Sequence, residues 1–185
     1  PERSPQLPLR IVYTGRLLSL EMRDPTLLLK ALQEEALDKW VQRGAVEVHW
    51  YCDNASQQLL EQLLEASPPG VRAAQHFHAM VPYAEVPKVL AQADMLLLLG
   101  RREQPEGPHG MVTTKLFEAM VMHRPILMVE SDESVVAQIL RAHGGALAAT
   151  DVAQVVAFVA HHLERLERGE ALPRETFTDH YQQYT

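Results

Sequence analysis

Short apolar runs alternate with longer segments of helical periodicity along most of the chain. The apolar runs predict six strands, at residues 9–14, 46–52, 71–77, 95–99, 125–129 and 146–149. The segments between and after them predict helices, at residues 24–43, 56–66, 83–93, 113–123, 134–142 and 151–168. Strands that alternate with helices of this length pair in parallel through right-handed crossovers. The pattern therefore predicts an α/β fold with a doubly wound parallel sheet of about six strands and helices on both faces.

Turn residues mark several element boundaries. Gly15 directly follows the first apolar run, and the pair Asp24-Pro25 is typical of a helix start, with an N-cap residue and a proline in the first turn. The run at 95–99 is the most hydrophobic, which favours a central strand covered on both faces. Residues 169–185 are expected to form an irregular or helical tail that packs on a neighbour. We expect a single domain over residues 1–185.

The composition is that of a folded protein and excludes several classes of function. Of the 185 residues, 46% are hydrophobic and 22% charged. The net charge of −7 repels polyanions, so we expect no nucleic-acid partner. The single cysteine, Cys52, excludes an intrachain disulfide and fits a reducing cytoplasm. No apolar run approaches the roughly 20 residues of a membrane-spanning helix. Because the chain begins with Pro1, we expect it to be a fragment of a longer protein.

The predicted fold indicates where a ligand would bind. In an open parallel sheet, ligands lie beyond the carboxyl ends of the strands, beside helix N-termini. Gly15 allows a close approach of the backbone there, and Arg16 and Arg23 bring two guanidinium groups that suit phosphate. The alternative interpretation is a pair of solvated surface arginines. Neither G-x-G-x-x-G after the first strand nor a P-loop motif is present, which argues against dehydrogenases and P-loop enzymes.

A second candidate region lies around the predicted helix at 113–123. A glycine-containing loop that leads into a helix presents free backbone N–H groups and the positive end of the helix dipole to an anion. Glu118, in the second turn, is suited to accept hydrogen bonds from a ribose diol. The alternative is that Lys115 and Glu118 form a modest surface pair at i,i+3.

Histidines and the cysteine suggest other chemistry, but the sequence supports it weakly. His76 and His78 would point to one face of a strand, yet spacing identifies no carboxylate cluster or third ligand, so we expect no metal. His109 lies in the loop before the candidate helix, where it can contact a phosphate or sugar or remain merely exposed. Cys52 has no partner histidine at a recognisable spacing, which favours a small buried residue over a nucleophile.

Several motifs, taken in order, resemble one family. The segment at 114–120, followed by His123-Arg124-Pro125-Ile126-Leu127, is similar to the K-L-F-E-Y-L...G-R-P-I-L segment of retaining glycosyltransferases of the two-Rossmann-domain (GT-B) type, group 1 and family 4-like. Upstream, three further stretches resemble the family in the same order and spacing, at residues 13–17, 81–87 and 93–98. The resemblance covers residues from about 9 to 168. The family that the chain resembles includes enzymes that build polysaccharides.

The resemblance implies the C-terminal, donor-binding half of such an enzyme, which holds a nucleoside-diphosphate sugar for retaining transfer. Glu118 would bind the ribose, and Arg16 and Arg23 would neutralise the diphosphate. Val81 and Pro82 would lie beside the base. The loop and helix start would meet the sugar and the phosphates, through the residues His109, Gly110, Met111, Thr114, Lys115 and Leu116. No metal cofactor is implied, and an N-terminal domain would bring a glycan or lipid-linked acceptor, at the inner face of the membrane or in the cytoplasm.

Two departures from the family pattern keep other functions open. The family commonly has a glutamate eight positions before Glu118, where this chain has Gly110, and the usual lysine of the first loop is absent, with Arg23 as its best substitute. The alternative function is therefore a non-catalytic Rossmann-like regulatory or docking module. A related sugar-nucleotide epimerase is a third candidate, although no catalytic carboxylate set for it can be identified. The base, sugar, acceptor and linkage are left open by the sequence.

Overall fold

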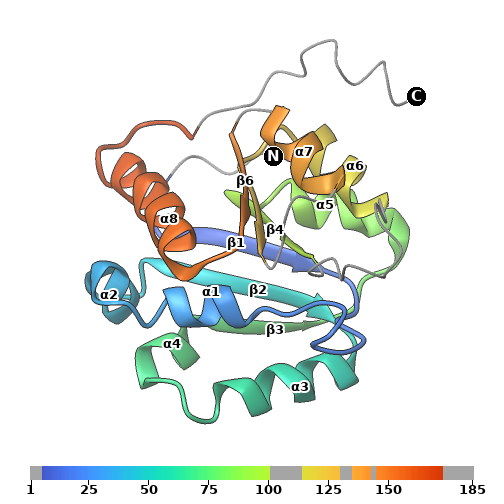
Figure 1. Cartoon of the computed structure of the whole chain (residues 1–185), viewed down its shortest axis with the longest axis horizontal. Helices are drawn as coiled ribbons and strands as arrows, with labels where there is room; N and C mark the ends of the chain where they lie inside the picture. Colours follow the sequence, from blue (N-terminus) through green and yellow to red (C-terminus); the bar gives the residue numbers. More distant parts are fainter. Residues whose placement is uncertain (1–5, 101–113, 130–134, 143–144, 173–185) are drawn as a thin grey trace.

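A six-stranded, fully parallel sheet forms the centre of the molecule (Figure 1). The computed structural model describes residues 6–100, 114–129, 135–142 and 145–172. The strand order is β3-β2-β1-β4-β5-β6, with the change of direction between β1 and β4 that defines a doubly wound sheet. The strands are β1 (Leu9–Thr14), β2 (Val46–Cys52), β3 (Gln75–Ala79), β4 (Met95–Leu99), β5 (Ile126–Val129) and β6 (Ala146–Ala149). This confirms the predicted fold class.

Helices cover both faces of the sheet and form a separate apolar core with each (Figure 1). The larger core packs β1 and β2 against α1 (Thr26–Ala31), α2 (Glu35–Gln42), α3 (Asn54–Leu64), α4 (Pro69–Ala73) and α8 (Val152–Glu167). The smaller core lies on the opposite face, under α5 (Val86–Leu90), α6 (Thr114–Val121) and α7 (Val135–Ala142). A short 3-10 helix, η1 (Tyr83–Glu85), precedes α5.

Strand β2 shows how the sequence assigns its two faces. Val46, Val48, Trp50 and Cys52 are buried in the larger core, because alternate side chains of a strand point to the same side. The intervening residues 47, 49 and 51 are half-buried and polar or amphipathic. The second face of the β2–β3 edge is therefore built from polar side chains, unlike the apolar second face of β4 and β5.

Two predicted elements are wrong in detail. The single helix predicted at 24–43 is two helices, because Glu34 is extended (φ −71°, ψ 140°) and interrupts the hydrogen-bond ladder. The break shifts which residues are buried: Ala36, four residues after Leu32, is exposed, and Leu37 enters the larger core instead. The strand predicted at 71–77 starts later, at Gln75, because Pro69 at a first-turn position begins α4.

Elsewhere the boundaries agree to within a few residues. The helix predicted to have Asp24 as its N-cap and Pro25 as its first residue starts one residue later, with Pro25 as the N-cap and Thr26 as the first residue of α1. The Asp24 carboxylate accepts a hydrogen bond from the Thr26 backbone N–H at 2.8 Å. The tail predicted at 169–185 is described only as far as Leu172, which is buried in the larger core. The remainder lies outside the described residues.

Candidate functional site

The turn after β1 brings the protein backbone close to a side chain of α6. Gly15 has φ +114°, a conformation that favours glycine, and its N–H donates to the Tyr51 carbonyl of the neighbouring strand at 2.9 Å. A Cβ at this position would collide with Nζ of Lys115. The absence of a side chain at Gly15 thus lets the lysine from a helix 100 residues later lie directly over the turn.

Lys115 is half-buried, and its ammonium group faces the side chain of Tyr13. Its Nζ donates a long hydrogen bond, 3.3 Å, to the Tyr13 hydroxyl and lies 4.8 Å from the centre of the Tyr13 ring. Within the described part of the chain, no carboxylate comes within ion-pair distance of it. Burial, with the nearby positive charge of Arg23, lowers the pKa of Lys115 from 10.5 to about 8, although Glu118 acts in the opposite direction.

The two arginines of the first loop lie on the same side of the turn. Arg23 donates from Nη1 to the Arg16 carbonyl at 2.6 Å, and the Tyr13 hydroxyl donates to that same carbonyl at 2.9 Å. The Arg16 guanidinium pairs with Asp53 at 3.2 Å and is more than half exposed. The Arg23 side chain is therefore held against the Arg16 backbone near Lys115, whereas the Arg16 guanidinium is directed to Asp53.

Asp53 links this loop to the start of α3, because its carboxylate pairs with Arg16 and accepts from Ser56. It was not among the predicted site residues. It caps α3 by accepting from the Ser56 N–H at 3.1 Å, and hydrogen bonding to Ser56 keeps the pKa of this carboxyl below its usual value. Ser56, itself buried, accepts the Leu17 N–H at 2.9 Å. The sequence signal that could have found this arrangement is the Asp53-x-x-Ser56 spacing at a helix start.

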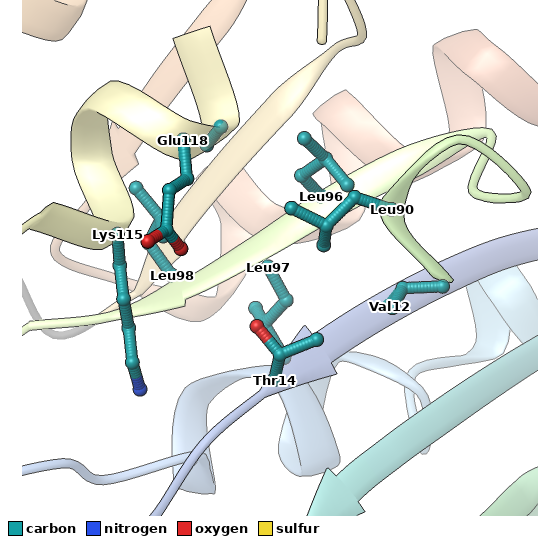
Figure 2. Close-up of a pocket in the computed structure, with 9 residues that line it drawn as sticks. Val12, Thr14, Leu90, Leu96, Leu97, Leu98, Lys115 and Glu118 are labelled. Atoms are coloured by element: carbon teal, nitrogen blue, oxygen red, sulfur yellow. The ribbon is translucent and has the colours of Figure 1, made fainter. Parts of the chain in front are cut away.

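Glu118 points from α6 into a small pocket between α6, β1 and β4 (Figure 2). The pocket is lined on its apolar side by Val12, Leu90 and Leu96–Leu98, and on its polar side by Thr14, Lys115 and Glu118. Its enclosed volume is about 10 Å³, room for about one water molecule. Among the described residues, no side chain hydrogen-bonds the Glu118 carboxylate and Lys115 forms no ion pair with it, so the predicted alternative of an i,i+3 pair is wrong.

The other predicted site residues are distributed around this pocket or away from it. Thr114 is exposed at the first position of α6, whereas Leu116 is buried in the smaller core. Val81 and Pro82 form the half-buried to exposed link between β3 and η1. His109, Gly110 and Met111 lie outside the described residues. The structure therefore brings together Gly15, Arg16, Arg23, Lys115 and Glu118.

Cys52 is fully buried at the end of β2, which confirms the prediction of a small core residue. Burial, with the negative charge of Asp53, raises the pKa of the thiol to about 11. A thiol that stays protonated at neutral pH is a poor nucleophile.

His76 and His78 do lie on one face of β3, as predicted. The parallel register sets His76 beside His49 of β2, and Glu47 lies two residues before His49 on the same face. Spacing along one strand could not identify this third and fourth residue, because they come from a neighbouring strand. The group lies on the sheet face, apart from the pocket at Glu118.

Comparison with solved structures identifies the class of fold. The crystal structure of WaaG, a glycosyltransferase involved in lipopolysaccharide biosynthesis, superimposes with TM-score 0.59 at 17% identity over 90% of this chain and 41% of WaaG. HepE from Anabaena, in complex with UDP, matches with TM-score 0.59 at 17% identity over 89% of this chain and 41% of HepE. The catalytic domain of cholesterol-alpha-glucosyltransferase from Helicobacter pylori matches with TM-score 0.57 at 16% identity, covering 88% of this chain and 91% of that domain. The fold is the Rossmann-like half of a GT-B glycosyltransferase.

The family follows from the sequence match. The family model for glycosyl transferases group 1 matches residues 8–165, so the chain belongs to that family. It spans about two fifths of the length of WaaG and HepE. A search of the curated proteins found no match. Among the described residues, no helix is both long and apolar enough to cross a membrane.

Proposed function

We propose that this chain is the donor-binding half of a retaining glycosyltransferase and holds a nucleoside-diphosphate sugar across the turn after β1. In this arrangement Arg16, Arg23 and Lys115 bind the diphosphate, and Glu118 accepts hydrogen bonds from the ribose diol. Val81 and Pro82 lie beside the base. The HepE structure contains UDP, and a pneumococcal O-GlcNAc transferase of similar fold contains UDP and GlcNAc, which makes UDP the first nucleotide to test.

The observation that carries this proposal is the half-buried ammonium group of Lys115, which has no carboxylate within ion-pair distance among the described residues. Burial of a charge without a partner is unfavourable, and burial lowers the pKa of Lys115 for the same reason. A diphosphate would supply negative charge, and the nearby guanidinium groups would add charge-assisted hydrogen bonds. The Glu118 carboxylate lies one helical turn away, and together the two groups match a ligand that is anionic at one end and rich in hydroxyls at the other.

The proposed reaction moves a sugar from diphosphate to an acceptor hydroxyl. The bond between the anomeric carbon and the diphosphate oxygen breaks, and a bond to the acceptor oxygen forms on the same face of the sugar. The acceptor proton passes to a phosphate oxygen of the leaving group. Negative charge grows on that leaving group in the transition state, where fixed cations stabilise it. This chemistry needs no protein nucleophile, and the cations of the site replace a metal ion.

The small size of the enclosed pocket agrees with a shared site. A cavity of about 10 Å³ holds no nucleotide, so the donor would lie across the mouth of the pocket and be covered from the other side. We propose that an N-terminal domain provides that cover and binds a glycan or lipid-linked acceptor, in the cytoplasm at the inner face of the membrane. The isolated chain would then bind nucleotide weakly and transfer little.

A non-catalytic docking module derived from this fold is the second candidate. The substitution of Gly110 for the glutamate common in the family favours it. This candidate predicts no saturable nucleotide site, so one binding measurement separates the two.

Calorimetric titration of the chain with UDP, GDP and ADP tests the proposal. We expect one nucleotide to bind saturably, and Glu118→Gln to weaken it by about 10-fold or more, because two hydrogen bonds to a charged acceptor are lost. Glu85→Gln is the matched control, since that exposed carboxylate pairs only with Lys88 on the surface. Folded protein that binds none of the three, or equal affinity in Glu118→Gln and the wild type, would favour the docking module.

A further inference from the structure

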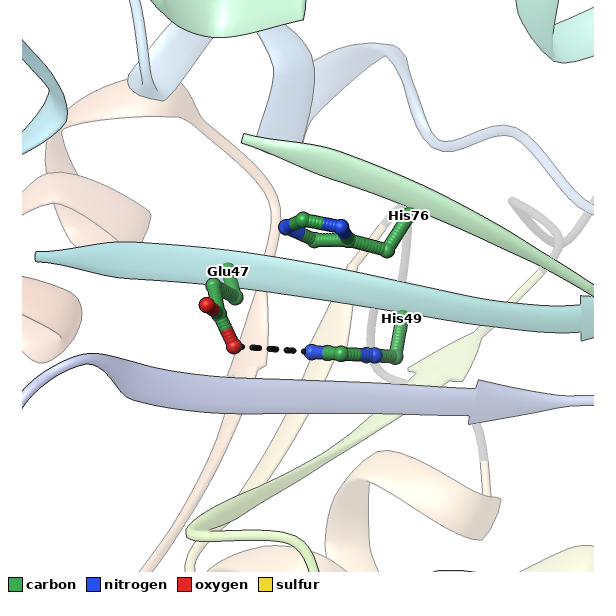
Figure 3. A group of neighbouring side chains, drawn as sticks. All are labelled: Glu47, His49 and His76. Carbon is green, nitrogen blue, oxygen red and sulfur yellow. Dashed lines mark hydrogen bonds and ion pairs between the residues drawn. The ribbon is translucent and has the colours of Figure 1, made fainter. Parts of the chain in front are cut away.

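Three imidazole rings and one carboxylate gather on the polar face of β2 and β3. His49 stacks against His76 with ring centres 4.8 Å apart and against His78 at 5.2 Å. The stack continues from His78 to Tyr51, at 4.3 Å. Glu47 reaches along its own strand to His49, with its Oε2 3.0 Å from Nε2 (Figure 3). Among the described residues, neither apolar core includes a member of this group, and all four members are half-buried.

The sheet register is what creates the group. In a parallel ladder His49 pairs with His76, and the two-residue repeat of a strand puts Glu47 on the same side as His49. The ligand atoms of these three residues all lie within 4.8 Å of one another. Ligand atoms around a tetrahedral zinc ion are separated by roughly 3.3–3.5 Å, so closing the set needs side-chain movements of about 1 Å.

We propose that Glu47, His49 and His76 form a binding site for a divalent transition metal ion of the zinc type. Two imidazole nitrogens and one carboxylate oxygen are the ligand set of zinc sites that keep a position open for water or another ligand. The ion would enter between Glu47 Oε2 and His49 Nε2 and replace the proton that those two atoms share. The half-buried position leaves the fourth coordination position accessible.

His78 would support the site from behind. His49 Nδ1 lies 2.9 Å from His78 Nε2. With a metal ion on Nε2, a neutral His49 carries its proton on Nδ1 and donates it to His78. Such an outer hydrogen bond fixes the tautomer and the ring orientation of a ligating histidine. His78 is thus a positioning residue rather than a ligand.

Arg10 limits the affinity of the site. Its Nε lies 3.2 Å from Glu47 Oε2, so the cation already neutralises the carboxylate that the metal ion needs. A metal ion must compete with this ion pair and with the hydrogen bond from His49. We therefore expect reversible binding rather than a metal ion that the fold requires.

Calorimetric titration of the untagged full chain with zinc chloride, and separately with magnesium chloride, tests this site. One zinc ion is expected to bind saturably, whereas magnesium, which prefers oxygen ligands and octahedral geometry, is expected not to bind. His49→Gln and Glu47→Gln are expected to remove the zinc binding, and His78→Gln to weaken it about 10- to 100-fold. His161→Gln, at an exposed histidine of α8, is the matched control and keeps the wild-type affinity.

Two further readouts locate the ion and check the fold of the variants. Zinc is expected to raise the melting temperature of the wild type but not of Glu47→Gln, because a ligand stabilises only the state that binds it. Histidine ring nitrogen shifts on zinc addition are expected at His49 and His76. The proposal is overturned if zinc does not bind saturably, if the Glu47 and His49 variants retain the wild-type affinity, or if the shifted rings lie elsewhere in the chain.

Discussion

The turn after β1 and the polar face of β2–β3 both concentrate charged and titratable side chains, but they balance them differently. At the turn, the half-buried Lys115 ammonium lies near another cation, and among the described residues its hydrogen bond is to a neutral hydroxyl. On the sheet face, Glu47 accepts from both Arg10 and His49, and His49 in turn bonds His78. Burial lowers the pKa of His49, which favours the neutral ring in this network.

The two sites are therefore expected to differ in how strongly their stability depends on a bound ligand. A network that satisfies its own groups is stable without a ligand, and a metal ion there must displace existing hydrogen bonds. A buried cation without a counter-charge costs stability until an anion arrives. We therefore expect the turn after β1 to depend on its ligand more strongly than the histidine face does.

The largest expected effect is on Lys115. Lys115→Met keeps most of the side chain's packing but removes the charge, so the free energy of unfolding is expected to rise by about 1–3 kcal/mol. Nucleotide affinity is expected to fall about 10- to 100-fold, because charge-assisted hydrogen bonds are lost. Urea denaturation and calorimetry measure the two changes. A variant that is less stable than the wild type would show that Lys115 is already compensated in the free protein.

A smaller effect is expected from pH, and it has opposite signs for stability and binding. The pKa of Lys115 is about 8 in the folded chain against 10.5 for the ordinary group, so the unfolded state binds more protons between these values. The free energy of unfolding from this group therefore rises as pH increases from about 8 towards 10.5. Nucleotide affinity falls over the same interval, because the amine loses its charge.

Other groups near Lys115 do not obscure this pH interval. Burial raises the pKa of Tyr13 above its ordinary value, and that of Cys52 to about 11. Urea denaturation and nucleotide titration at pH 7.5 and 9.5 check the signs of the two pH dependences. In the control Lys115→Met, the change with pH of both the free energy of unfolding and the nucleotide affinity should be smaller. Parallel slopes for stability and affinity would contradict the assignment.

The smallest expected effect is on the sheet face in the absence of metal. Glu47→Gln removes the ion pair with Arg10 but keeps the shape and a hydrogen-bonding amide. Because the pair is partly exposed, the free energy of unfolding is expected to fall by less than about 1 kcal/mol. Urea denaturation in a chelator measures this change. A loss of several kcal/mol would mean that the histidine face stabilises the fold as strongly as a core contact does.

Much of the fold was predictable because apolar periodicity is a local property of the chain. The central strand β4 and the amphipathic helix α8 follow directly from it. The break at Glu34 was not predictable, since Leu28, Leu32 and Ala36 keep a four-residue spacing across it. The late start of β3 was missed because Val71, an apolar β-branched residue, lies in a short helix that tertiary packing selects.

The candidate site was predictable in composition but not in arrangement. Gly15, Arg16 and Glu118 could be chosen because strand ends and helix starts are visible in the sequence. The close approach of the Lys115 ammonium to Gly15, from 100 positions away, is encoded by no local pattern. The roles of Tyr13 and Asp53 in holding the arginine loop likewise depend on side chains meeting between β1 and α3.

By itself, the sequence determined the order of strands and helices, the family, and which residue types face the carboxyl ends of the strands. These depend on the spacing of apolar residues and on short motifs, which act over a few residues. Only the tertiary structure decided that Lys115 of α6 meets Tyr13 and Gly15 at the turn after β1 and that His49 meets His76 across two strands. Charge compensation and ligand geometry depend on distances between segments, and those distances are set by how the crossovers pack the sheet.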